Sequence, residues 1–223
     1  FRLDTTKGPV LLRFCKNKKV EEINYELSVM RVLKANNYPS AYPIERKDGK
    51  YITKTPRGNV VLYEYIEGEE PKPNTNTVKE AARATALLSI IPNWESLEQE
   101  NPCGSTLCRE VMTNLNTASE DLQELVEFFK KEDAFFNGKI GNNLPRGFVH
   151  GVMFPDNTKF KGDKLLAVLD FEEICTDELL FDIAATINGF CFANNVLDLK
   201  LVDVFIEEYE KIRKLTQEEK NHL

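Results

Sequence analysis

The 223-residue chain is 42% hydrophobic and 29% charged, a composition typical of a globular protein with a substantial core and unlike disordered or membrane-spanning chains. The net charge of −7 argues against a nucleic-acid-binding protein, which needs a basic face, but it leaves room for a nucleotide held by local donors or a metal ion. No apolar run approaches the ~20 residues of a membrane span, and five scattered cysteines predict reduced thiols in a cytoplasmic protein.

The sequence pattern of the first part of the chain predicts a small β-rich unit built around one helix. Four short strands are expected, at 1–4, 10–14, 51–52 and 60–65. A helix is expected over 20–36, with apolar residues recurring at 3–4 spacing on one face: Ile23, Leu27, Met30 and Leu33. Glu26 falls on that face, where a buried carboxylate needs a cation or a hydrogen bond. A glutamate at the helix edge that reaches solvent explains the spacing equally well.

A polar, proline-rich linker over 69–77 predicts a boundary between a first lobe, 1–68, and a second lobe, 69–223. The second lobe is expected to be mainly helical, with helices over 78–91, 107–115, 120–131, 179–192 and 199–214. Thr216 and Glu219 form a capping-box signature close to the last residue, and the chain begins inside a strand. We therefore expect a fragment of a longer protein.

A hairpin is predicted around Gly162, from strands at 158–160 and 165–169. If Phe160 pairs with Leu165, then Asn157 lies opposite Val168, within reach of the metal ion that Asp170 could bind, given ~3.3 Å per residue. An amide oxygen and a carboxylate suit Mg²⁺, which leaves room for phosphates. An ordinary hairpin with polar ends explains this pattern equally well.

The segment 148–157, Phe-Val-His-Gly-Val-Met-Phe-Pro-Asp-Asn, is followed thirteen residues after Asn157 by Asp170 and Phe171. This layout resembles the catalytic loop and metal-binding segment of the aminoglycoside and choline kinase group, relatives of the protein kinases. Several stretches look like the bacterial-type homoserine kinases of that group: 144–150, 154–157, 169–171, 175–177, 181–184, 187–192 and 209–216. The resemblance is specific over 144–216 and looser over the first lobe.

The resemblance implies an α+β protein-kinase-like fold of two lobes. The N-lobe would be small, β-rich and incomplete, and the C-lobe mainly helical with a catalytic hairpin. The implied activity is transfer of the γ-phosphoryl group of ATP to a small-molecule hydroxyl. Homoserine is the implied acceptor, giving O-phosphohomoserine on the route to threonine. No nucleic-acid or membrane partner is expected, and the protein would be a monomer or a dimer.

Site residues follow from the same resemblance. Asn157 and Asp170 would hold Mg²⁺ on the ATP phosphates. Glu26 would orient Arg13, which stands where many relatives have Lys. His150 would brace the loop as a structural residue.

Two further roles are implied by position. The hinge would be 61–66, where backbone groups of Glu64 and Ile66 would hydrogen-bond adenine. Asp182 would anchor the helix that follows it, without a catalytic role.

Val152 occupies the position of the catalytic aspartate in this group, and valine can neither accept a proton nor orient a hydroxyl. The glycine-rich phosphate loop, expected before Phe1, is also absent from the sequence, and Ser89 stands where relatives usually place a histidine. Two alternatives therefore stay open. One is a kinase for another small alcohol or amine, such as choline, methylthioribose or an aminoglycoside. The other is a pseudokinase that binds nucleotide and acts through a partner.

Overall fold

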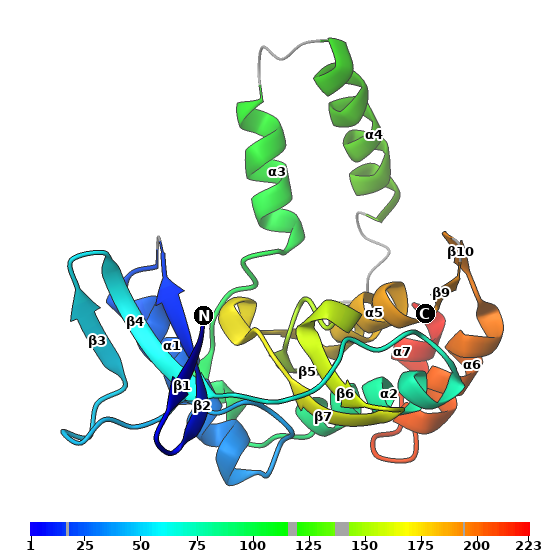
Figure 1. The fold of residues 1–223 in the computed structure, drawn as a ribbon. Coiled ribbons are helices and arrows are strands. Elements are labelled where there is room, and N and C mark those ends of the chain that lie inside the picture. The colour runs from blue at the N-terminus through cyan, green and yellow to red at the C-terminus, as the bar shows by residue number, and fades with distance from the viewer. Residues whose placement is uncertain (17, 116–119, 137–142, 194) are drawn as a thin grey trace.

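The computed structural model describes residues 1–16, 18–115, 120–136, 143–193 and 195–223. The chain opens with an antiparallel four-stranded sheet in the order β1-β2-β4-β3 (Figure 1). Its strands are β1 (Arg2–Thr5), β2 (Gly8–Cys15), β3 (Ile52–Thr55) and β4 (Gly58–Glu64). Helix α1 (Val20–Ala35) packs Ile23 and Leu27 against Val61 and Tyr63 of this sheet, as the apolar spacing predicted.

The sheet contains two hairpins with the same turn chemistry. Thr5 donates its hydroxyl to the carbonyl oxygen of Gly8 at 2.7 Å, and Thr55 does the same to Gly58 at 2.8 Å. The two glycines adopt φ of 112° and 117°, a region that side chains with a Cβ avoid. This Thr-x-x-Gly pattern fixes the register of both hairpins.

The rest of the molecule is mainly helical, with α2 (Thr75–Ser89), α5 (Leu179–Phe190), α6 (Leu199–Tyr209) and α7 (Gln217–Asn221). Three two-stranded sheets accompany the helices: β5 (Arg146–Val149) with β8 (Cys175–Glu178), β6 (Thr158–Lys161) with β7 (Lys164–Val168), and β9 (Phe192–Ala193) with β10 (Val196–Leu197). Short 3₁₀ turns lie at Trp94–Leu97, Pro155–Asn157 and Phe171–Glu173. The predicted α+β class is confirmed.

Two buried clusters hold these elements together by removing apolar surface from water. One cluster joins Val29 and Leu33 of α1 to Leu88 of α2, Phe148 of β5 and Phe171 beyond β7. The other packs α2 against α5 and α6. Because the first cluster includes residues from both sides of position 68, α1 shares a core with the second half of the chain. The division into 1–68 and 69–223 stays a prediction.

The predicted linker 69–77 is too long at its C-terminal end, because α2 begins at Thr75. Asn74 caps the helix, its side-chain oxygen accepting hydrogen bonds from the backbone N–H groups of Asn76 at 2.8 Å and Thr77 at 3.2 Å. At the other end, Glu69 exchanges two backbone hydrogen bonds of 2.8 Å with Phe160. The segment is therefore tied to β6 as well as to α2.

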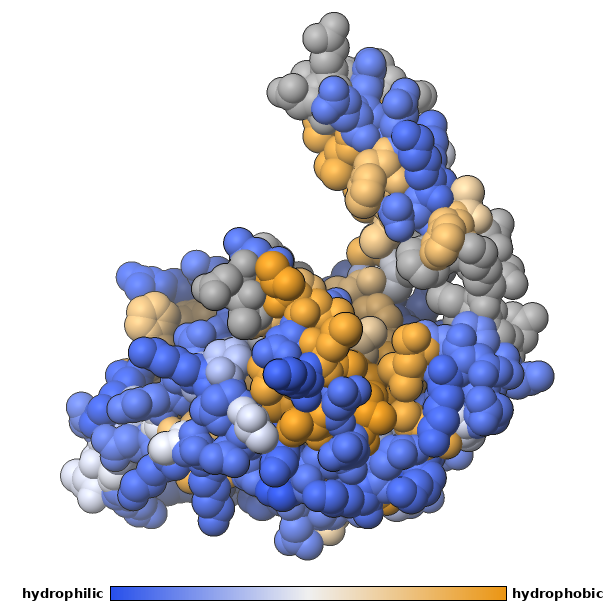
Figure 2. All heavy atoms as spheres, turned by 90° about the vertical axis from the view of Figure 1, so that its right-hand side faces the viewer, coloured by the Kyte–Doolittle hydropathy of each residue, from blue (hydrophilic) through white to orange (hydrophobic). Residues whose placement is uncertain are grey.

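Helices α3 (Ser105–Asn114) and α4 (Glu120–Phe136) stand as a pair that projects from the body (Figure 1). They carry exposed apolar side chains: Leu107, Val111, Leu125, Phe128 and Phe135. More apolar surface gathers on the face below them, around β9, β10 and the start of α6 (Figure 2), where Val196 and Leu199 are 67% and 68% exposed. Across the described residues, none of the helices combines the length and apolar character that crossing a lipid bilayer requires.

Candidate active site

The open end of the β6–β7 hairpin carries Asn157 and Asp170. Thr158 pairs with Val168 and Phe160 with Leu165, and the register shifts between Lys159 and Phe160. The predicted pairing of Asn157 with Val168 is therefore wrong by one residue, because it assumed an unbroken ladder. The irregularity brings Asn157 opposite Leu169, whose N–H donates to the Asn157 carbonyl at 2.8 Å. Asn157 thus lies one residue closer to Asp170 along the hairpin than predicted.

Asp170 adopts the left-handed conformation, with φ of 59°. Aspartate tolerates this region better than most residues, and such backbone strain is concentrated at functional sites. Burial raises the pKa of the Asp170 carboxyl, Glu172 raises it further, and Arg13 and Lys18 oppose the shift.

A cavity of about 450 Å³ lies between the first sheet and the hairpin. Polar side chains line it from both sides: Arg13, Glu26, Ser40, Tyr63, Asp156, Asn157, Asp170 and Glu172. The structure therefore brings together four of the predicted site residues. Concave sites with a few convergent polar groups are the usual form of a small-ligand site.

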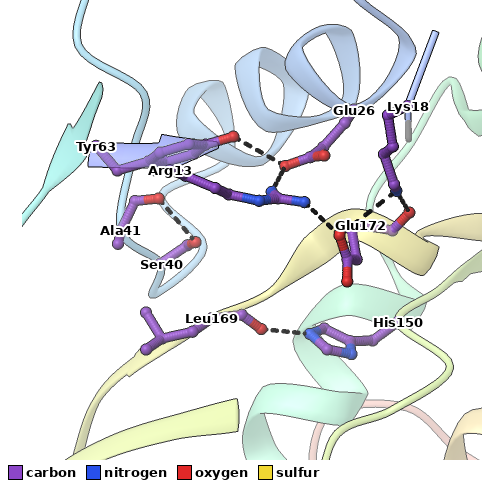
Figure 3. A network of polar contacts seen from close by, with 9 residues as sticks. All are labelled: Arg13, Lys18, Glu26, Ser40, Ala41, Tyr63, His150, Leu169 and Glu172. Atoms are coloured by element: carbon purple, nitrogen blue, oxygen red, sulfur yellow. Dashed lines mark hydrogen bonds and ion pairs between the residues drawn. The ribbon is translucent and has the colours of Figure 1, made fainter. Parts of the chain in front are cut away.

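Arg13 and Glu26 form an ion pair, with 2.6 Å between Nη1 and Oε1 (Figure 3). The Glu26 side chain is 4% exposed and also accepts the Tyr63 hydroxyl at 2.8 Å. Burial lowers the pKa of the Arg13 guanidinium, but Glu26, Tyr63 and Glu172 together raise it above its ordinary value. Of the two readings of Glu26, the buried carboxylate with a cationic partner is the one found, and the solvent-facing one is wrong.

The loop after β5 is fixed by Asp182, which lies in the first turn of α5. Its carboxylate is buried and accepts the backbone N–H of His150 at 3.0 Å and of Gly151 at 2.9 Å. Burial raises the pKa of Asp182, while His150 and these two hydrogen bonds oppose the shift. Asp182 thus anchors α5 by tying the helix to the loop before Asn157.

His150 is fully buried and holds the loop through its ring. Nε2 lies 2.8 Å from the Leu169 carbonyl oxygen, so this nitrogen donates, and Nδ1 accepts the Val152 N–H at 3.4 Å. The ring also packs edge-on against Phe171, with centroids 4.7 Å apart. Burial lowers the pKa of His150, and this hydrogen-bond pattern fits the neutral imidazole. The contacts are those of a residue that supports the loop.

Replacing Asp182 with Ala is expected to lower the free energy of unfolding by roughly 2–5 kcal/mol, because two buried backbone N–H groups lose their acceptor. Chemical denaturation of wild type and variant measures the difference. Asp203→Ala, at an exposed position of α6, serves as the control and should change stability by less than about 0.5 kcal/mol. A loss below about 1 kcal/mol for Asp182→Ala would contradict the anchoring role.

Val152 is half-buried and its backbone is fully engaged. Its carbonyl oxygen accepts the Asn157 side-chain amide nitrogen and the Phe154 N–H, both at 2.8 Å. Since the amide nitrogen of Asn157 is used in this way, its amide oxygen is the atom left for a ligand. Backbone hydrogen bonds at position 152, in which the side chain takes no part, therefore help to hold the loop.

The donor set of the cavity fits Mg²⁺ better than a metal held by protein ligands alone. Within the described ranges, no group of three or more His, Cys, Asp or Glu side chains could hold a metal ion. Mg²⁺ does not need such a group, because it retains water and binds one or two carboxylates together with phosphates. Asn157 and Asp170 supply an oxygen pair of this kind.

The two predicted adenine-binding positions lie outside the lining of this cavity. Glu64 is the last residue of β4, and Ile66 follows it along the chain. The Glu64 N–H donates to the Tyr42 carbonyl at 2.9 Å, so this group is occupied. Only its carbonyl oxygen, with the backbone of Ile66, is left for the hinge role, which stays a prediction.

Three residues in or next to the site were not predicted from the sequence: Lys18, Glu172 and Gly189. Glu172 contacts Arg13, 159 positions away in the sequence, and Lys18, 154 positions away. Gly189 of α5 lies under the loop, where an added Cβ would be 2.6 Å from a ring carbon of Phe154. No sequence pattern marks these contacts, since each depends on packing between distant elements.

The sequence is similar to known phosphotransferases over most of its length. The model of the phosphotransferase enzyme family matches residues 1–215. A homoserine kinase from Sinorhizobium fredii is 29% identical over 98% of this chain and 68% of its own length. A homoserine kinase from Caulobacter vibrioides is 28% identical over the whole chain and 72% of its own length.

Two solved structures share the fold at low sequence identity. An amicoumacin kinase in complex with AMP-PNP and Ca²⁺ superposes with a TM-score of 0.74 at 13% identity, covering 96% of this chain and 70% of that one. A spectinomycin phosphotransferase in complex with ADP and spectinomycin gives 0.71 at 14% identity over the same shares. Both resemblances concern the fold.

Proposed function

Because this chain belongs to the phosphotransferase enzyme family, we propose that it transfers the γ-phosphoryl group of ATP to the hydroxyl group of homoserine. One observation carries the proposal: Asn157 and Asp170 line a single cavity with the Arg13–Glu26 ion pair. Phosphoryl transfer depends mainly on positioning and charge neutralisation, which these residues can provide. Homoserine as the acceptor is supported by the homoserine kinases at 28–29% identity.

Each residue has a role in this proposal. The amide oxygen of Asn157 and the carboxylate of Asp170 would hold Mg²⁺, which supplies charge neutralisation on the phosphates. Arg13, oriented by Glu26, would contact a phosphate oxygen through the guanidinium nitrogen that Glu26 does not use. His150 and Asp182 would keep the loop in place and touch no substrate.

Val152 favours a second candidate, a protein that binds nucleotide without efficient catalysis. A missing general base typically costs ~10²–10⁴ in rate, so binding could persist while turnover is slow. In this case Asn157 and Asp170 would serve nucleotide binding alone.

A phosphorylation assay over an acceptor panel tests the proposed function. ADP release and the phosphorylated product would be measured with homoserine, choline, methylthioribose and an aminoglycoside, each with Mg²⁺ and ATP. We expect slow product formation with homoserine and none above background with the others. Preference for another acceptor would replace homoserine. ATP binding without turnover on the whole panel would favour the nucleotide-binding candidate.

A further inference from the structure

Arg13 is shared by two carboxylates that differ in burial. Nη1 contacts Oε1 of Glu26, whose side chain is 4% exposed, and Nη2 contacts Oε2 of Glu172, whose side chain is 40% exposed; each distance is 2.6 Å. Glu26 is held in place by the Tyr63 hydroxyl as well. Glu172 has no such burial, and ion pairs of exposed carboxylates are weak. The contact at Nη2 is therefore the exchangeable one.

A second cation converges on the same glutamate. Lys18 donates from Nζ to the backbone carbonyl of Glu172, and the same nitrogen lies 3.8 Å from the Glu172 carboxylate (Figure 3). Arg13 comes from β2 and Lys18 from the segment before α1, so two separate elements direct positive charge to one point. Guanidinium and ammonium groups arranged around an anion in this way bind phosphate as readily as carboxylate.

The position of Glu172 links this arrangement to the candidate active site. Glu172 follows Asp170 by two residues in a 3₁₀ turn, and both line the cavity that contains Asn157. Its carboxylate thus uses the guanidinium nitrogen of Arg13 that a phosphate in the same cavity would need as its cationic partner. A triphosphate carries more charge than one carboxylate and offers several oxygens at once.

We propose that Arg13 Nη2 and Lys18 Nζ form a seat for a nucleotide phosphate, and that the Glu172 carboxylate occupies this seat until the phosphate displaces it. This inference rests on the proposed function, because it concerns ATP. Lys18 is then a phosphate-binding residue, and Glu172 is an internal competitor that weakens nucleotide binding. Arg13 keeps its contact with Glu26 throughout, since the two carboxylates use different nitrogens.

Calorimetric titration of ATP and of adenosine, with Mg²⁺ present, tests the seat. Glu172→Gln removes the competing charge and is expected to tighten ATP binding about threefold to tenfold. Lys18→Gln is expected to weaken it by a similar factor. Adenosine, which has no phosphate, should bind wild type and both variants equally.

Matched controls separate the seat from general charge effects. Glu173→Gln is the control for Glu172→Gln: it removes the same negative charge at a neighbour that forms no ion pair among the described residues. Lys16→Gln is the control for Lys18→Gln: it removes the same positive charge at an exposed lysine close to Lys18. Both should stay within about twofold of wild type. Thermal unfolding of all four variants checks that each is folded.

The outcomes are distinct. Equal ATP affinity of wild type and Glu172→Gln, or equal tightening by Glu173→Gln, overturns the seat and leaves the proposed function standing. Adenosine affinity that changes together with ATP affinity overturns it too. Absence of ATP binding in every form removes the proposed function, and the seat with it.

Discussion

Replacing Val152 with Asp is expected to raise the rate of homoserine phosphorylation by at least about a hundredfold, because the change restores a proton acceptor worth ~10²–10⁴ in rate. We expect the loop to keep its hydrogen bonds after this change, because His150 and Asn157 contact the backbone N–H and carbonyl of Val152 and not its side chain. Initial rates of ADP release at saturating ATP, with and without homoserine, give the comparison.

Val152→Asn is the matched control for this experiment, because asparagine has the shape of aspartate without its basicity. We expect its rate to stay within about tenfold of wild type. Equal rates for wild type and Val152→Asp would show that position 152 does not limit the reaction. An Asn variant as fast as the Asp variant would assign the gain to polarity instead of proton transfer.

Removing the carboxylate of Asp170 is expected to weaken Mg²⁺-dependent ATP binding at least about tenfold, since a hard cation loses its charged ligand. Asp170→Asn is the preferred change, because asparagine also tolerates the observed φ of 59° whereas alanine would add strain. Titrations of ATP with Mg²⁺ and with a chelator measure the metal-dependent part of the affinity.

Asp203→Ala, on the exposed side of α6, serves as the control for the metal site and should bind ATP as wild type does. In chelator, Asp170→Asn should bind ATP at least as tightly as wild type, because no metal ion is then involved and a negative charge beside the phosphates is removed. An Asp170→Asn variant with undiminished Mg²⁺-dependent binding would exclude Asp170 as the metal ligand.

Much of the fold follows from local patterns in the sequence. The 3–4 spacing of apolar residues in α1 predicts its buried face, whose first part packs against the sheet and whose second part packs against the rest of the chain. The predicted capping box is confirmed by reciprocal hydrogen bonds between Thr216 and Glu219 at the start of α7. These features depend on residues a few positions apart, where spacing carries the information.

Other features depend on contacts that spacing does not encode. Strands β5 and β8 pair although their nearest partners, Val149 and Cys175, are 26 positions apart, and β8 has too few apolar residues to be recognised as a strand. The register shift at Lys159 and Phe160 involves no glycine that would mark it. Glu172 reaches Arg13 only because the first sheet and the residues that follow the hairpin line the same cavity. Each of these arises from tertiary packing, which overrides local preference.

The burial of helix α1 limits how the site can be controlled. In protein kinases a glutamate that pairs with the strand lysine is carried by a helix whose position controls activity, and we propose the same pairing role for Glu26 of α1. Here Val29, Met30 and Leu33 of α1 are buried in one cluster with Phe171, the residue after Asp170. Swinging the helix outward would expose side chains worth ~1.5–3 kcal/mol each. This burial opposes an outward movement of α1, so we expect changes at the site to involve single side chains at the mouth of the cavity.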